Sequence, residues 1–367
     1  MSEWATRIPD RRLLILLLAL MCTSALAKSP GRVGAYMNFS RGYSKTPEEL
    51  KALINEAADA GVQFLIPYAR TTEGTAFYDS KIMPQLPKGY DALRVVIEAA
   101  HARGLKVYPW FVVASEGFDA PSAILKEHPD WCQVDIKGKR VPWLDPSCPE
   151  ARQFIVSIVK EIAANYDIDG LNLDYLRYRE GRYCYCDRCT SAFKEEFGLD
   201  AKACDDPDNG YVNWGKWRLW RFRQNNELAR EIRAGLREVK PDAELSAYVW
   251  GAQAYGTGWS ICQDWQTWVE EGLLDWVNPM GYYSIQREFQ TAAKWNREMA
   301  TPDLPMLVTL AVSRRRGPAR TKQQIKDAMD CGADGVVFFT LEYSRPMLKE
   351  LSPLLHELQT SDRRPAS

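Results

Sequence analysis

Short apolar runs alternate with amphipathic segments along most of the chain, and there are eight of each. Several of the apolar runs are continuous, which is typical of parallel strands buried on both faces. The predicted strands are residues 33–39, 64–68, 106–113, 170–174, 244–250, 276–282, 306–312 and 335–341. The predicted helices are residues 47–60, 90–103, 149–165, 214–239, 264–271, 288–299, 321–331 and 345–359.

A glycine lies at each of four predicted junctions from helix to strand: Gly61, Gly104, Gly272 and Gly332. A helix commonly ends at a residue with a left-handed backbone, and this residue is usually glycine. Eight strand–helix units predict an α/β fold closed into a single (β/α)8 TIM barrel rather than an open sheet. The long segments 69–90, 114–148, 175–213 and 251–263 all follow strands. They therefore belong to the C-terminal face of the barrel, where active sites are built.

The first 27 residues have the pattern of a secretory signal peptide. Two arginines precede an apolar run at 13–22, and Ala25-Leu26-Ala27 supplies a small-x-small cleavage site. We predict a signal peptide at 1–27, one barrel domain at 28–360 and a disordered tail at 361–367. Cleavage near Ala27 would place the protein outside the cell or in the periplasm. A lipid anchor on Cys22 is disfavoured by the bulky Met21 before it.

Composition narrows the classes of partner. The 367 residues are 46% hydrophobic and 26% charged, with a net charge of −1. This balance gives no electrostatic case for binding nucleic acid. No segment after the signal is long and apolar enough to make an integral membrane protein. The sequence leaves the oligomeric state open.

Asp174 is the leading candidate for chemistry. Alternation along strand 170–174 points Leu171 and Leu173 outward and points Asn172 and Asp174 into the barrel. Asp174 then lies at the mouth, where a carboxylate is costly unless it is used, paired or hydrated. The alternative role is a structural ion pair with Arg177 or Arg179.

Glycoside cleavage generally needs two carboxyl groups. The first choice for the second one is Glu342, which follows strand 335–341 on the same predicted face as Phe338. Glu73 and Glu116, in the loops after strands 2 and 3, come next. Asp145 is better explained as a turn or helix-capping residue.

Aromatic residues are plentiful, with 13 Trp and 17 Tyr. Sugar rings present apolar faces to aromatic planes and hydroxyls to hydrogen-bonding groups. The predicted substrate-binding residues at the mouth are Arg70, Trp110, Asn172, Tyr248, Trp250, Asn278 and Tyr282. Trp217 and Trp220, in helix 214–239, are instead predicted to anchor that helix to the barrel.

A CxCxxC motif, Cys184-Tyr185-Cys186-Asp187-Arg188-Cys189, follows strand 4. Three close thiolates and one remote cysteine suit a structural zinc site, with Cys148 as the favoured fourth ligand and Cys132 or Cys204 as alternatives. Disulfides are the rival explanation in an exported protein. In either case the motif would brace the loop beside Asp174.

Only three histidines occur, at positions 101, 128 and 356. This scarcity excludes a barrel hydrolase that depends on several metal-binding histidines. There is also no P-loop, dinucleotide-binding motif or nucleophile elbow. We therefore expect catalysis without a cofactor.

The chain resembles the glycosyl hydrolase-like 10 family from about Gly34 to Leu341. The resemblance is carried by residues 75–80, 100–107, 143–147, 166–178 and 275–280. It implies an exported barrel that cuts bacterial cell-wall glycan, with Asp174 as the carboxylate of the catalytic site. This chain departs from the family at Asn172, where relatives often carry His, and in the CxCxxC motif.

The sequence thus predicts a glycoside hydrolase acting on a polysaccharide or a peptidoglycan-type glycan. Two rival functions are a glycan-binding barrel without turnover and a structural partner in the cell envelope. The latter predicts no carboxylate-lined cleft at the strand ends.

Overall fold

The computed structural model describes residues 30–39, 46–86, 89–204, 212–251, 258–313 and 317–360. The predicted signal peptide with Cys22 and the predicted tail both lie outside these residues. Within them, no helix combines the length and the apolar character needed to cross a membrane.

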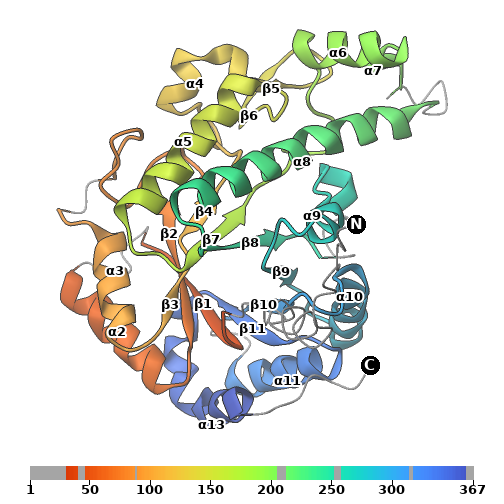
Figure 1. Ribbon diagram of the computed structural model, residues 1–367. Helices are drawn as coiled ribbons and strands as arrows, with labels where there is room; N and C mark the ends of the chain where they lie inside the picture. The colour runs from red at the N-terminus through yellow and green to blue at the C-terminus, as the bar shows by residue number, and fades with distance from the viewer. Residues whose placement is uncertain are drawn as a thin grey trace, which may run out of the picture.

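A closed barrel of eight parallel strands forms the centre of the molecule, which confirms the predicted (β/α)8 fold (Figure 1). Each strand pairs with its neighbours in the chain, and β1 pairs with both β2 and β11 to close the ring. The third strand of the barrel consists of two short segments. The barrel strands are β1 (Val33–Met37), β2 (Phe64–Arg70), β3 (Lys106–Val107), β4 (Trp110–Val112), β7 (Gly170–Asp174), β8 (Glu244–Val249), β9 (Trp276–Gly281), β10 (Leu307–Ala311) and β11 (Gly335–Phe339).

Helices surround the barrel, as expected from the amphipathic segments (Figure 1). The first of these helices begins at Pro47, because proline suits the first helical position and because Thr46 and Glu49 form a reciprocal capping box. The surrounding helices are α2 (Pro47–Asp59), α3 (Ala92–His101), α5 (Pro149–Asn165), α8 (Trp214–Val239), α9 (Trp265–Glu270), α10 (Gln286–Met299), α11 (Gly317–Asp330) and α13 (Leu348–Thr360).

Most strands end within two residues of their predicted bounds, and two of the differences bear on the site. The third strand is interrupted at Tyr108-Pro109, because proline has no backbone N–H for the ladder. The eighth ends at Phe339, and a short helix, α12 (Leu341–Ser344), follows at once. Glu342 therefore lies in a helical turn, where the two-residue alternation used to place it no longer applies.

The long loops after the third and fourth strands contain structure that was not predicted. The first holds α4 (Ala123–Glu127) and the antiparallel pair β5 (Cys132–Val134) and β6 (Arg140–Leu144). The second holds α6 (Asp187–Phe197) and α7 (Ala201–Cys204), which lie beside the N-terminal half of α8 (Figure 1).

A second hydrophobic cluster holds these loops together. Trp217 and Trp220 stack on each other with ring centroids 5.3 Å apart, and they pack with Cys184, Cys189 and Phe193. The prediction that these two tryptophans anchor α8 to the barrel is therefore wrong. They anchor it to the loop after β7, whereas Leu228, Ile232 and Leu236 hold the C-terminal half against the main core.

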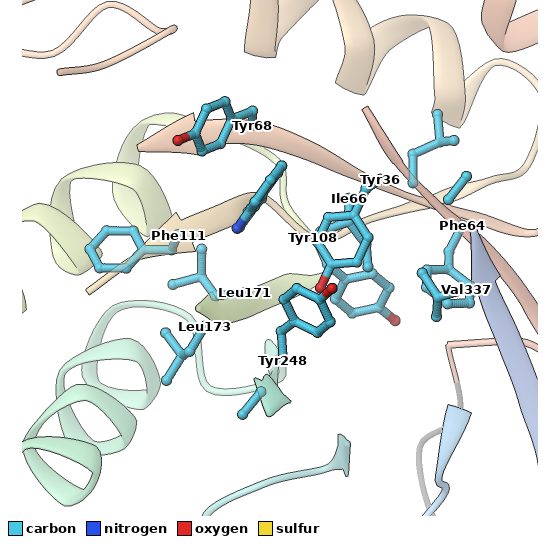
Figure 2. Packing of buried hydrophobic residues seen from close by; sticks show 14 of the residues in the cluster. Tyr36, Phe64, Ile66, Tyr68, Tyr108, Phe111, Leu171, Leu173, Tyr248 and Val337 are labelled. Carbon is cyan, nitrogen blue, oxygen red and sulfur yellow. The ribbon is translucent and has the colours of Figure 1, made fainter. Parts of the chain in front are cut away.

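The two faces of the barrel strands differ. The face toward the helices is apolar, whereas the interior combines aromatic rings such as Phe64 and Trp276 with buried amides. Leu171 and Leu173 lie on the side of β7 that faces the surrounding helices, while Tyr36 and Tyr248 meet near the axis (Figure 2). This alternation agrees with the predicted strand faces and turns Asn172 and Asp174 inward.

Candidate active site

A cavity of about 940 Å³ opens at the C-terminal ends of the strands. Its floor comes from residues at the ends of six strands: Tyr68, Trp110, Asp174, Tyr248, Met280 and Phe339. The loop after β2 supplies one wall through Thr71, Thr72, Glu73 and Thr75. The cleft is thus at the face where the strand-following loops predicted it.

Asp174 is the last residue of β7 and lines this cavity. Its Oδ2 accepts a hydrogen bond from Trp110 Nε1 at 2.9 Å, and its Oδ1 accepts one from the backbone N–H of Tyr175 at 2.7 Å. The side chain is almost fully buried, and this burial raises the pKa of Asp174 to about 7. A carboxyl group with this pKa can hold or release a proton at neutral pH.

The chain turns sharply after Asp174. Tyr175 has a left-handed backbone with φ of 56°, an uncommon conformation for a residue with a side chain. Arg177 then stacks against Trp143, Tyr175 and Trp250, with its guanidinium carbon 4.7–5.2 Å from the ring centroids.

Arg177 and Arg179 do not form an ion pair with Asp174. The Nη1 of Arg177 donates instead to the carbonyl oxygens of Tyr178 and Arg179, at 3.1 and 3.0 Å. The Nε of Arg179 lies 3.9 Å from Oε1 of Glu180. The Arg177 charge still lowers the pKa of Asp174, although by less than burial raises it.

The candidate second carboxylates lie in three different settings. Glu73 is exposed and lines the cavity, where it accepts a hydrogen bond from Thr72 Oγ1 at 3.0 Å. Glu342 is half-buried, and its Oε1 accepts from the backbone N–H of Asn38 at 2.8 Å. Glu342 is not among the cavity-lining residues. Of the β11 residues, Phe339 lines the cavity, whereas Phe338, whose face Glu342 was predicted to share, does not.

Glu116 is fully buried and forms an ion pair with Arg70, which is buried as well. Arg70 also donates to the backbone carbonyl oxygens of Val112 and Val113. The structure therefore places Arg70 behind the cavity wall, where it ties the end of β2 to the loop after β4.

Asn172 and Asn278 lie one layer below the cavity, inside the barrel. Asn172 Nδ2 donates to Ser246 Oγ and to Asn278 Oδ1, at 2.8 and 2.9 Å. Tyr36 donates to Asn172 Oδ1 at 2.6 Å and accepts from Asn278 Nδ2 at 2.8 Å. Both amides are fully buried, and neither lines the cavity. They support the floor on which Asp174 rests.

The four aromatic residues predicted to bind substrate all line the cavity: Trp110, Tyr248, Trp250 and Tyr282. The hydroxyls of Tyr248 and Tyr282 are hydrogen-bonded to each other. Trp110 packs on Tyr68 with ring centroids 4.2 Å apart, so its plane is fixed while its N–H reaches Asp174.

The residue pattern matches the glycosyl hydrolase-like 10 family over residues 35–324. The chain belongs to this family. Among curated relatives, glycosyl hydrolase DigH of Escherichia coli K12 is 27% identical over 273 residues, which are 63% of this chain and 57% of DigH. Glycosyl hydrolase YngK of Bacillus subtilis 168 is 27% identical over 65% of this chain and 49% of YngK. The chain thus spans about half the length of these relatives.

Solved glycosidase structures share the fold of this glycosyl hydrolase-like 10 chain. The glycoside hydrolase domain of PgaB (BpsB) from Bordetella bronchiseptica superposes with a TM-score of 0.70, at 16% identity, over 89% of this chain and 99% of that domain. A β-galactosidase from Bacillus circulans sp. alkalophilus gives a TM-score of 0.64, at 17% identity, over 90% of this chain and 56% of the enzyme.

Several cavity residues of this glycosyl hydrolase-like 10 protein were not predicted as part of the site. Phe118 and Tyr343 line the cavity and are 58% and 45% exposed. Both belong to segments that follow strands, and an aromatic residue in such a loop is the signal that could have identified them. Arg177 was considered only as an ion-pair partner.

Proposed function

We propose that this protein hydrolyses a glycosidic bond in a polysaccharide or a peptidoglycan-type cell-wall glycan. The observation that carries the proposal is Asp174, a buried carboxyl group with a pKa of about 7 on the floor of an aromatic-walled cavity. A raised pKa of this kind suits a general acid. The family resemblance supports the choice of glycan.

Asp174 would donate its proton to the glycosidic oxygen as the bond to the anomeric carbon breaks. Trp110 Nε1 would hold the carboxyl group in one orientation throughout. Glu73, the exposed carboxylate on the same cavity, is the proposed partner and would take a proton from the water that attacks the anomeric carbon. Glu342 is the second choice, because it is not itself among the cavity-lining residues, whereas Asn38, whose backbone N–H it accepts from, is.

The direct test is product analysis. The purified full-length protein is incubated with peptidoglycan sacculi and with a panel of polysaccharides, and the soluble fragments are analysed by mass spectrometry. We expect fragments that carry one added water per cleaved bond from at least one glycan. Binding to a glycan without any fragment would instead favour a binding barrel without turnover.

The pH dependence follows from the state of Asp174. A general acid must be protonated, so kcat/KM should fall about tenfold per pH unit above pH 7. Initial rates at low substrate concentration between pH 4 and 9 measure this profile. A rate that rises through pH 7 would contradict the acid assignment and indicate that ionised Asp174 is a nucleophile.

The rim aromatics should affect binding more than turnover. Phe118→Ala and Tyr343→Ala each remove an exposed ring that can stack on a sugar outside the reacting subsite. We expect KM to rise about 3- to 10-fold with kcat nearly unchanged, from the energy of one aromatic contact. Steady-state kinetics on a soluble glycan fragment measures both constants. Trp295→Ala, at an exposed tryptophan on α10 that does not line the cavity, is the control.

A further inference from the structure

Four potential metal ligands converge in the loop after β7, away from the cavity lining. The Sγ atoms of Cys184, Cys186 and Cys189 and a carboxylate oxygen of Asp145 all lie within 4.8 Å of one another. Cys184, Cys189 and Asp145 are buried, and Cys186 is half-buried. The cluster joins two loops, because Asp145 follows β6 and the cysteines lead into α6.

The fourth member is a carboxylate and not the cysteine predicted from the sequence. Cys148 precedes α5, and its thiol lies 3.3 Å from Glu150 Oε2, outside the group of four. None of the eight cysteines that the structure describes is in a disulfide.

The spacing of the four groups suits a tetrahedral ion. Zn–S bonds of about 2.3 Å and Zn–O bonds of about 2.0 Å put sulfur and oxygen about 3.5 Å apart around one zinc. Asp145 Oδ2 lies 3.2 Å from Cys186 Sγ and 3.3 Å from Cys189 Sγ. Only a small expansion would admit the ion.

The surroundings also suit thiolate ligands. Backbone N–H groups point at two of the sulfurs, from Val134 to Cys184 at 3.2 Å and from Cys189 to Cys186 at 3.5 Å. Ser147 donates to Asp145 from its N–H at 3.1 Å and from its hydroxyl at 2.7 Å. Hydrogen bonds of this kind orient first-shell ligands and offset their charge.

Charge gives a second, independent reason for an ion. Asp145 is fully buried, and its nearest cation is Arg188 Nη1 at 3.5 Å, on a side chain that is 32% exposed. Thiols are weak hydrogen-bond donors, so they compensate a buried carboxylate poorly. A divalent cation would replace these weak contacts with four bonds.

We propose that Asp145, Cys184, Cys186 and Cys189 bind one structural Zn²⁺. Three sulfurs and one oxygen in a tetrahedron favour zinc over ions that prefer octahedral oxygen sites. All four positions are filled by the protein, so the ion has no place for substrate. This proposal goes beyond the glycosidase activity and does not depend on it.

The ion would brace the segment that carries Asp174. Tyr178, four residues after Asp174, is fully buried in the same hydrophobic cluster as Cys184 and Cys189. Tyr178 also donates its backbone N–H to Ile261 and accepts from Arg177 Nη1. Cys186 lines a hollow of about 350 Å³, through which a chelator could reach the ion.

Metal analysis of the full-length protein tests the site. The protein is reduced, loaded with Zn²⁺, desalted and assayed by elemental analysis and differential scanning calorimetry. We expect one zinc per chain, and a Tm that falls by at least about 5 °C when a chelator removes it. Cobalt substituted for zinc should give the visible absorption bands of a tetrahedral thiolate site.

Variants identify the fourth ligand. Asp145→Asn should bind zinc at least 10-fold more weakly and lose the response to chelator, whereas Asp145→Cys should retain the ion and Cys148→Ser should match the wild type. Circular dichroism verifies that each variant is folded. Wild-type protein that binds no zinc, a disulfide among the three cysteines after reduction and reloading, or a loss of zinc in Cys148→Ser would each overturn the assignment.

Discussion

Asp174→Asn should lower kcat by about 10²- to 10⁴-fold, the usual contribution of a general acid. The amide has nearly the same shape as the carboxyl group, and its oxygen can still accept the hydrogen bond from Trp110 Nε1. The lost property is the proton that a group with a pKa of about 7 can deliver. Fragment release from the glycan that the wild type cleaves measures the effect.

The same variant offers an internal control for folding. Burial raises the pKa of Asp174 above its value of about 3.9 in an unfolded chain, so the ionised group costs stability that grows from about pH 4 to pH 7. Asparagine does not carry this cost. The Tm of Asp174→Asn should therefore rise relative to that of the wild type between pH 4 and pH 8. A folded variant with wild-type turnover would remove Asp174 from the mechanism.

Glu116→Gln should lower the free energy of unfolding by about 3–5 kcal/mol, because it leaves the buried Arg70 charge without its partner. The pair connects the end of β2 to the loop after β4, and the loop that follows β2 carries Glu73. Urea denaturation followed by fluorescence measures the loss. Glu116 was also a candidate catalytic carboxylate, and this experiment separates the two roles.

A matched control is available on the surface. Arg223 and Glu196 form an ion pair at 2.7 Å with side chains that are 53% and 42% exposed. Glu196→Gln should change stability by no more than about 1 kcal/mol. If Glu116→Gln were equally mild but abolished turnover, Glu116 would be a catalytic group and not a structural one.

The fold could be predicted from the sequence because its units repeat a local pattern. Helices α5 and α8 occupy the predicted residues 149–165 and 214–239, since the amphipathic pattern lies within each segment and Pro149 opens the first. The prediction of strand extents was less accurate where a local feature interrupts the strand pattern. At Pro109 the strand is interrupted, and after Phe339 a helical turn replaces the alternation on which the placement of Glu342 depended.

The site was predictable in part for the same reason. The position of Asp174 at the mouth follows from strand parity alone, and so does that of Trp110. The positions of side chains in long loops cannot be predicted from strand alternation. The spacing of the cysteines showed that three thiols must be close, but it could not show which remote group meets them. Asp145 and Cys148 are only three residues apart and both precede α5, so their positions in the sequence did not distinguish them.

The floor beneath Asp174 is built from amides and hydroxyls: Tyr36, Asn172, Ser246, Asn278 and Thr309. Burial raises the pKa of Tyr36 well above its usual value of 10.0, so these five groups keep one protonation state across the range in which enzymes of this kind are assayed. Asn172, in this floor, carries an uncharged amide. The layer beneath Asp174 therefore keeps the same charge as the pH changes. In the proposed mechanism, the pH dependence would come from Asp174 and not from this layer.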